Sequence, residues 1–156
     1  MKFGTPKEVF EGENRVAMTP DSARQLQKLG YDCLVESGAG FNAGFADALY
    51  EDAGVTVVKT AAALWKEADI VAKVRQPEAA ELKRLHGGQT LISFFNPAAN
   101  EGGMEAAKKS GANVIAMEMV PRISRAQKMD ALSSMAHIAG CRAVIAAGND
   151  LPRFFT

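Results

Sequence analysis

The feature that most constrains the fold is a regular alternation of short apolar runs with longer amphipathic runs along the chain. We predict strands at 2–5, 31–37, 55–59, 69–74, 90–95 and 113–120, and helices at 19–30, 45–54, 60–68, 78–85, 101–111 and 131–148. Parallel strands need crossover connections, and helices supply them. The pattern therefore predicts an open, mainly parallel α/β sheet of the Rossmann or flavodoxin type, with helices on both faces.

The bulk composition limits the classes of function. The chain has 156 residues, with 18 basic and 18 acidic side chains, so its formal net charge is zero. This balance gives no electrostatic reason to expect binding to nucleic acid or to an anionic membrane. We expect no membrane span, because no apolar run is long enough, and no signal peptide, because the start is polar. A soluble, cytoplasmic protein is predicted.

The cysteines and histidines predict neither a metal site nor a nucleophile. Cys33 and Cys141 lie in apolar contexts without a CxxC motif, so we interpret both as buried side chains in a reducing compartment. We expect His86 to cap a helix end and His137 to be a core residue of an apolar helix. No metal-ligand set and no Ser-His-Asp or Cys-His set can be assembled from these residues.

The last predicted helix, 131–148, is rich in small residues three and four positions apart, such as Ala136, Gly140 and Ala143. Small side chains let another helix approach closely. Arg142 and the polar first turn favour a buried helix of a soluble protein over a membrane span. We therefore expect a large body to pack against this helix, either the rest of a longer chain or a second subunit.

The segment Gly38-Ala39-Gly40-Phe41-Asn42-Ala43 matches the GxGxxA pattern of dinucleotide-binding loops and follows a predicted strand. Two features contradict that function. The acid that binds the ribose should lie about 20 residues later, where the next strand ends in Lys59 and Thr60. The next helix also begins only after Phe45, so its N-terminus would not meet a pyrophosphate. We predict that this domain lacks its own dinucleotide fingerprint.

Polar residues follow three of the predicted strands: Lys7, Glu8, Arg15, Lys73, Arg75 and Asn96. Ligands of open parallel sheets bind beyond the carboxyl ends of the strands, so a basic residue there could hold a carboxylate. For the loop after the first strand, a solvated surface loop is the alternative that we favour.

The segment "PRISRAQKMDALSS", residues 121–134, is more basic than a connection after an apolar strand requires. Arg122 and Arg125 carry planar, permanently charged groups that suit a phosphate or a carboxamide oxygen. Gln127 can both donate and accept, and Asp130 could be the N-cap of the following helix. Chemistry alone leaves two alternatives open: a binding loop, or a capped helix with solvated arginines.

The longer string "MEMVPRISRAQKMDALSSMAHIAGCRAV" resembles the NAD(H)-binding alpha subunit of proton-translocating NAD(P) transhydrogenases. The strings "GTPKE", "ENRVAMTP", "VESGAG", "DIVAKVRQP", "TLISFFNPAAN" and "RFFT" agree as well, so the resemblance covers essentially the whole chain. Alanine dehydrogenase shares this architecture. There, a lysine and a histidine at the positions matching Arg75 and Asn96 act on the keto acid. This chain has neither, although Arg15 is shared, so the resemblance disfavours amino-acid oxidation.

The resemblance implies that the loop reaches the nicotinamide end of NAD(H), with NADP(H) bound on a partner component. It implies cofactor contacts at Arg122, Ile123, Ser124, Arg125, Gln127, Lys128, Met129, Asp130 and Ser133. Arg122 and Gln127 would hold the nicotinamide, and Asp130 would fix the loop or the carboxamide. No catalytic acid or base is implied, because hydride passes directly between two nicotinamides and the protein supplies orientation.

The resemblance also implies a fragment, since the family's alpha subunit continues past "RFFT" into a Rossmann domain with the true glycine fingerprint. We expect an N-terminal α/β domain at 1–130, then a connecting helix and tail at 131–156. The implied partners are a second copy in a homodimer, the NADP(H)-binding component and a membrane proton-channel component. They would place the protein in the cytoplasm, peripheral to the inner membrane. Alone, the fragment should bind NAD(H) weakly or not at all and be inactive.

Two other functions stay open. The chain could be a fragment of an alanine dehydrogenase-like enzyme that uses the same sheet edge for a keto acid. It could instead be a non-enzymatic dimerisation or regulatory module built on the same fold.

Overall fold

The computed structural model describes residues 1–152, which form two compact units, Met1–Ala116 and a second unit that begins at Met117. Each unit is described by itself. The division that we expected at residues 130 and 131 concerns the domains of a whole protein and remains a prediction. The string at 153–156, which contributed to the resemblance, and the end of the predicted tail lie outside the described residues.

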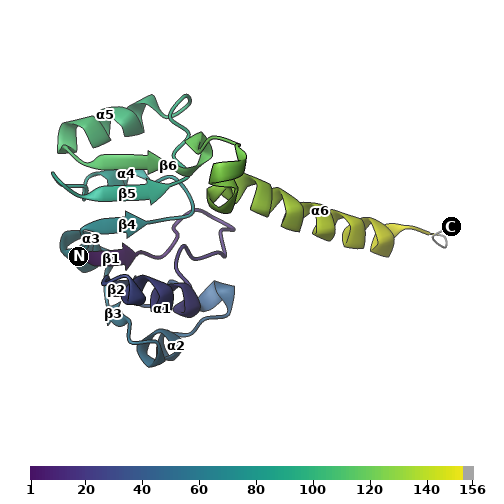
Figure 1. The fold of residues 1–156 in the computed structure, drawn as a ribbon, viewed down its shortest axis with the longest axis horizontal. Helices are drawn as coiled ribbons and strands as arrows, with labels where there is room; N and C mark the ends of the chain where they lie inside the picture. The colour runs from purple at the N-terminus through teal and green to yellow at the C-terminus, as the bar shows by residue number, and fades with distance from the viewer. Residues whose placement is uncertain (153–156) are drawn as a thin grey trace. The chain divides into compact units, whose positions relative to one another are not determined.

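The first unit contains a six-stranded, entirely parallel sheet in the order β3-β2-β1-β4-β5-β6, which can be followed in Figure 1. Its strands are β1 Lys2–Thr5, β2 Asp32–Glu36, β3 Thr56–Val58, β4 Ile70–Ala72, β5 Thr90–Ser93 and β6 Asn113–Ala116. The chain builds outward from β1 to β3, crosses back to β4 beside β1, and builds outward to β6. The predicted parallel α/β fold is confirmed.

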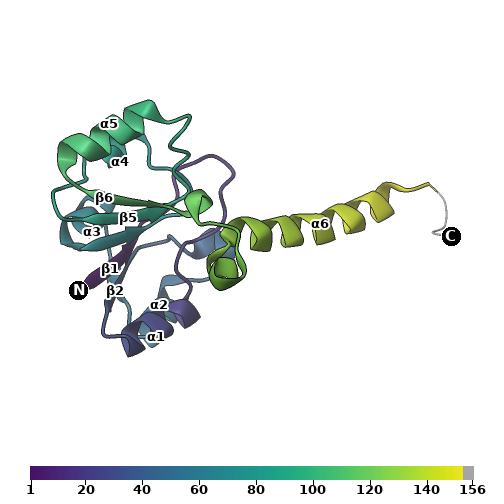
Figure 2. The same ribbon diagram turned by 45° about the horizontal axis from the view of Figure 1, so that its top comes forward.

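Helices cover both faces of this sheet, as predicted. Their bounds are α1 Pro20–Lys28, α2 Asp47–Asp52, α3 Ala61–Glu67, α4 Ala79–Leu82 and α5 Glu101–Ser110, with a short 3₁₀ turn, η1, at Phe41–Ala43. One core joins α1 and α2 to β2, and another joins α3, α4 and α5 to β4 and β5. Figure 2 shows α4 and α5 on one side of the sheet and α1 and α2 on the other.

Each core is built around large buried side chains. Tyr50 is fully buried on the α1–α2 side, and its hydroxyl donates to the Met18 carbonyl at 2.8 Å, so burial raises its pKa to about 12 without leaving it unpaired. Trp65 and Phe95 are fully buried on the other side. There α3 approaches β1 closely, because a Cβ at Gly4 would lie 2.8 Å from the Ala68 Cβ.

The start of α1 follows from its sequence. The Thr19 hydroxyl accepts a hydrogen bond from the Ser22 backbone at 3.2 Å, and the Ser22 hydroxyl accepts one from the Thr19 backbone at 2.8 Å. This reciprocal cap satisfies two backbone donors that the helix leaves without partners. Pro20 fits the first position because it lacks an N–H group. The predicted cap at Thr19 is confirmed.

Several predicted elements are too long. The strand predicted at 113–120 ends at Ala116, because its pairing with β5 stops where Ser93 is opposite Ala116. An edge strand without a partner has no ladder to continue, and Met117–Met119 form a 3₁₀ turn, η2, instead. The helix predicted at 78–85 is a single turn, α4.

The second unit consists of η2, a second 3₁₀ segment η3 at Ser124–Met129, and the helix α6 at Ala131–Asp150. No residue of α6 is buried by the described chain, so the burial that we expected is not provided by these residues. Among residues 1–152, α6, with 20 residues, is also the one helix that is long and apolar enough, by length and composition alone, to cross a bilayer. This corrects the expectation of no such run. Arg142 interrupts the apolar residues of α6, so we did not count them as one run. The hydropathy averaged over the helix remains high enough despite this one charge.

Candidate functional site

The polar segment that precedes α6 is a folded loop made of consecutive turns. The Ile123 N–H donates to the Pro121 carbonyl at 2.9 Å, the Ala126 N–H to the Ile123 carbonyl at 2.9 Å, and the Asp130 N–H to the Gln127 carbonyl at 3.2 Å. Ala126 is buried, whereas the neighbouring side chains of η3 are exposed. These turns order the backbone of the loop and leave its polar side chains at the surface.

Asp130 is the N-cap of α6, which is one of the two roles that the sequence left open. Its Oδ1 accepts the Ser133 N–H at 3.0 Å, and its Oδ2 accepts the Ser133 hydroxyl at 2.5 Å. The Ser134 hydroxyl donates to the Asp130 carbonyl at 3.2 Å. These Ser133 bonds, with a smaller contribution from the charge of Arg122, lower the pKa of Asp130 below its ordinary value. Asp130 is therefore an anion that joins the loop to the helix.

The loop and the first turn of α6 enclose a shallow cavity of about 290 Å³. Its lining residues are Arg122, Ile123, Ser124, Gln127, Asp130 and Ser133. All of them belong to the set for which the resemblance implied cofactor contacts. The other members of that set, Arg125, Lys128 and Met129, are not among the lining residues. Ligand pockets begin at about 300 Å³, so this cavity suits one ring of a larger ligand.

The donors in this cavity are available to a ligand. Within the part of the chain that the structure describes, the side chains of Arg122 and Gln127 form no hydrogen bond. A guanidinium, an amide and the Ser124 hydroxyl, beside a carboxylate that already accepts the Ser133 hydroxyl, match a neutral or cationic ring that carries a carboxamide. The donor set can therefore hold a ring that carries a carboxamide, such as a nicotinamide.

The GxGxxA segment has a structural explanation. The Asp47 carboxylate accepts hydrogen bonds from the Ser37 hydroxyl at 2.6 Å and from the Gly38 N–H at 2.8 Å. A Cβ at Gly40 would lie 2.6 Å from the Tyr50 hydroxyl oxygen and 2.7 Å from the Phe45 carbonyl oxygen. The helix after this loop, α2, begins at Asp47, beyond the glycines. Packing and turn geometry thus account for both glycines without a cofactor.

The loop after β1 is only partly the solvated loop that we favoured, because the side chains of Glu8 and Glu13 are buried, whereas Lys7 and Glu11 are exposed. The Glu13 side chain is 3% exposed and accepts hydrogen bonds from Arg15 Nε at 2.6 Å and from Arg75 Nε at 2.8 Å. Hydrogen bonding, with Arg15 contributing most, lowers the pKa of Glu13 to about 2. The Arg75 guanidinium also lies over the Phe10 ring, 4.9 Å from its centroid. Both arginines at this edge are therefore paired with a carboxylate of the chain itself.

A second buried cluster joins the same loop to α4. The Lys73 ammonium, with a fully buried side chain, lies 2.6 Å and 2.8 Å from the two oxygens of Glu81 and 3.7 Å from Glu8. Glu8 also accepts the Val74 N–H at 2.6 Å. Burial raises the pKa of Glu8, although the charge of Lys73 opposes the shift. Lys73 is therefore buried and paired with carboxylates of the chain itself, so its ammonium group is not available to bind a ligand.

Glu13 and Glu81 were not predicted as site residues from the sequence, because neither follows a strand directly. Glu13 lies two residues before Arg15, and Glu81 lies three after Glu78, whose N–H donates to it at 2.9 Å. These spacings were the available signals. Asn96, which the sequence singled out, lies three residues beyond the end of β5 and has a left-handed backbone with a φ of 51°. Asn tolerates this conformation better than most residues.

Some predictions about histidine and cysteine are wrong. His86 lies beyond α4, which ends at Leu82, so it does not cap that helix, although its Nδ1 is 3.4 Å from the Gly87 carbonyl oxygen. His137 and Cys141 are both exposed on α6, and His137 Nε2 lies 3.9 Å from Cys141 Sγ. The apolar residues of α6 are spread over all sides of the helix, so its sequence does not reveal which side a partner would cover. Cys33 is buried, as predicted.

Comparisons with known proteins identify the family. The profile described as "Alanine dehydrogenase/PNT, N-terminal domain" matches residues 4–139. The chain is 67% identical over 156 residues, all of its own length and 30% of the relative's, to the NAD(P) transhydrogenase subunit alpha of Cereibacter sphaeroides. It is 39% identical over 153 residues to the alanine dehydrogenase of Halomonas elongata, covering 98% of the chain and 41% of that protein.

A solved structure gives the same result. The transhydrogenase from Sinorhizobium meliloti matches with a TM-score of 0.92 and 40% identity, over 98% of this chain and 46% of that one. The chain thus spans less than half the length of these relatives. The higher identity to the transhydrogenase subunit agrees with Arg75 and Asn96, which depart from the alanine dehydrogenase pattern. The resemblance found in the sequence is confirmed: the chain belongs to the alanine dehydrogenase/PNT N-terminal domain family and is more similar to the transhydrogenase alpha subunit than to this alanine dehydrogenase.

Proposed function

We propose that this chain is the N-terminal part of the NAD(H)-binding component of a proton-translocating NAD(P) transhydrogenase, and that residues 121–134 position the nicotinamide. The whole protein would pass hydride between NADH and NADP⁺. One observation supports the role of the loop above the others. The side chains that line the cavity before α6 are those for which the resemblance implied cofactor contacts.

In this proposal the residues orient and do not exchange protons with the substrate. Arg122 and Gln127 donate to the carboxamide, and Asp130 keeps the loop joined to the first turn of α6 through Ser133. Hydride transfer is the chemistry that bound NAD(H) supplies. Orientation that holds reacting atoms at near-attack distance lowers a barrier by several kcal/mol. Arg125, Lys128 and Met129 contribute from outside the cavity.

The proposed partners are a second copy of the chain, an NADP(H)-binding component and a membrane proton-channel component. Subunit alpha of Cereibacter sphaeroides bears the name of one subunit of a larger assembly, which supports the existence of such partners. The protein would lie in the cytoplasm, peripheral to the inner membrane. The exposed α6, which no described residue buries, is available for the second copy or for the following domain.

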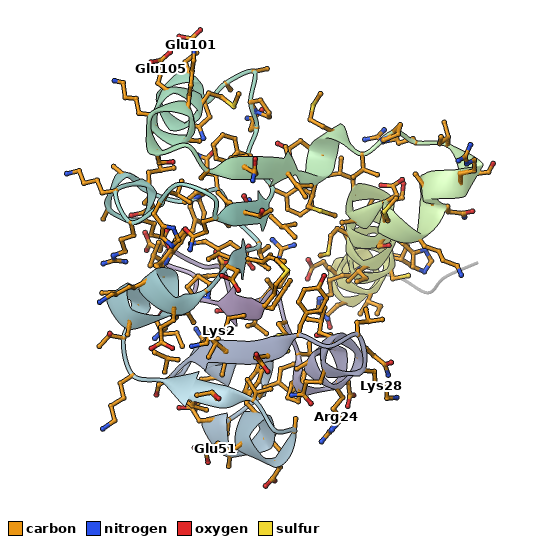
Figure 3. All side chains as sticks on the ribbon, turned by 60° about the vertical axis from the view of Figure 1, so that its left-hand side comes forward. Lys2, Arg24, Lys28, Glu51, Glu101 and Glu105 are labelled. Carbon is orange, nitrogen blue, oxygen red and sulfur yellow. The ribbon has the colours of Figure 1, made fainter. Side chains whose placement is uncertain are left out.

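The test compares single variants in the full-length protein that carries residues 1–156, mixed with its NADP(H)-binding component. Arg122→Ala should slow hydride transfer from NADH to NADP⁺ by about tenfold or more while NADH still binds. Arg24→Ala is the matched control, since Arg24 is exposed on α1 and, among residues 1–152, pairs only with Asp21 at 2.7 Å. Figure 3 labels Arg24. Arg125→Ala shows whether the effect extends beyond the cavity.

Unchanged hydride transfer in Arg122→Ala would contradict the proposal, and so would an equal loss in Arg24→Ala. Among the alternatives, oxidation of an amino acid is the second candidate, because alanine dehydrogenases are also relatives. The Glu13 carboxylate already occupies Arg15 and Arg75, which weighs against a keto acid there. NADH formation from alanine and NAD⁺ by the full-length protein would support that candidate instead.

A further inference from the structure

A groove in the first unit belongs to none of the sites described above. It lies between α4 and α5, has a volume of about 900 Å³, and is lined in part by Leu82, Leu85 and Ala106. This volume falls within the range of pockets that bind small organic ligands. The groove is on the sheet face opposite α1 and α2, in a different unit from the loop that precedes α6.

Most of the α5 residues that line the groove are small. Gly102, Ala106 and Ser110 recur every fourth residue along α5 and all line the groove. Residues four apart share one face of a helix, so their small side chains form a continuous floor. A Cβ built at Gly102 would meet no atom within 4 Å, which shows that this end of the floor is open.

The charges around the groove are asymmetric. Lys83 and Lys109 line it, and both lie at the C-terminal ends of their helices. Because α4 and α5 each lead into a strand of the same parallel sheet, the two helices run in the same direction, and these two residues belong to the same end of the groove. Neither forms an ion pair with any residue in the described chain. Figure 3 shows Glu101 and Glu105 on the outer side of α5, away from α4. Glu105 lies four residues before Lys109 on the same helix, but no ion pair joins the two side chains within the described residues.

The opposite end of the groove repels further negative charge. Glu78 lines it there, and at the N-terminus of α5 the Asn100 side chain already accepts the Gly103 N–H at 3.0 Å. A polyphosphate would place charge at both ends and is disfavoured. A ligand with one anionic end and an apolar body matches both the lysine pair and the small-residue floor.

We propose that this groove binds a small amphipathic carboxylate, an acyl or aryl acid whose apolar body lies on the floor formed by Gly102 and Ala106. The carboxylate meets Lys83 and Lys109. The proposal does not depend on NAD(H) binding or on the function of the loop before α6, because it rests on residues of α4 and α5 alone.

The test titrates decanoate into the full-length protein and follows binding by calorimetry. Gly102→Leu should weaken binding by about tenfold or more, because its side chain fills the open floor. Leucine favours a helix more than glycine does, so this variant should not lose stability. Gly102→Ala, which adds one methyl group, is the matched control and should keep most of the affinity.

The charge requirement is tested separately. Lys83→Gln combined with Lys109→Gln should weaken decanoate binding by roughly twofold to fivefold, since the pairs are exposed to solvent. Lys108→Gln is the control, because Lys108 is on the same helix but does not line the groove. Absence of decanoate binding at millimolar concentration would overturn the proposal. Equal affinity of Gly102→Leu and wild type, or equal affinity for decanol and decanoate, would do so as well.

Discussion

Asp130 and Ser133 are joined by two hydrogen bonds across the first turn of α6. One runs from the Ser133 N–H to Oδ1 at 3.0 Å and the other from the Ser133 hydroxyl to Oδ2 at 2.5 Å. Both residues also line the cavity with Arg122 and Gln127. The group that starts the helix is thus also a wall of the candidate site, so helix capping and positioning of the loop depend on the same carboxylate.

Replacing Asp130 should therefore disturb the helix start and the site together. Asp130→Ala removes both acceptors, and we expect the Ser133 amide proton to exchange with solvent about fivefold faster, with slower hydride transfer in the full-length protein. Asp130→Asn keeps one acceptor, so its amide exchange rate should lie between those of the wild type and Asp130→Ala. Amide exchange measured by NMR provides the check. A normal exchange rate in Asp130→Ala would show that the cap does not hold this turn.

Glu13 should make stability depend on pH in the acidic range. Its pKa in the folded protein is about 2, below the ordinary value of 4.5, so its contribution is complete above pH 4.5 and is lost as the pH falls towards 2. We expect Glu13→Gln to cost about 1–2 kcal/mol at pH 7, because Arg15 and Arg75 are partly exposed and solvent screens their charges.

The measurement compares urea unfolding of wild type and Glu13→Gln at pH 7, 4 and 2.5. The difference in the free energy of unfolding should shrink as the pH falls. Taking the difference between the two proteins cancels the effect of Glu8, whose pKa is shifted in the opposite direction. A difference that stays constant down to pH 2.5 would be incompatible with a stabilising Glu13 carboxylate.

Lys73 should be the most sensitive charged residue of the first unit. Its ammonium is fully buried beside Glu81, and Lys73→Met would leave the carboxylates of Glu81 and Glu8 without their cation. Breaking a buried ion pair on one side costs about 3–5 kcal/mol. Adding Glu81→Leu to this variant should restore part of the loss. Lys66→Met, at an exposed position on α3, is the control and should change stability by less than about 0.5 kcal/mol.

Gly40→Ala separates the structural role of the GxGxxA segment from a role in binding the cofactor. The added methyl group would lie 2.6 Å from the Tyr50 hydroxyl oxygen and 2.7 Å from the Phe45 carbonyl oxygen. We expect a loss of about 1–3 kcal/mol in unfolding free energy from overpacking. NADH affinity of the folded full-length protein should be unchanged in a fluorescence titration. Loss of NADH binding by a protein that remains folded would reassign these glycines to the cofactor.

The sequence by itself determined the order and type of the elements. The caps of Thr19 and Asp130 and the alternation of strands and helices were visible in it, because these features depend on residues close together in the chain. It also identified the polar loop before α6 through its resemblance to a family. A parallel sheet was predicted because a helix separates each strand from the next one along the chain.

Tertiary structure alone decided where the elements end and which charges meet. The end of β6 depends on where β5 stops pairing, which no pattern within residues 113–120 reveals. Glu13 and Arg75 are 62 positions apart, and Glu8 and Val74 are 66 apart, so only the folding of the sheet brings them together. Hydrophobic periodicity reports the surface that one element buries. It does not report distant partners, and for this reason the buried acids, the exposed His137 and Cys141, and the groove beside Gly102 became visible only in three dimensions.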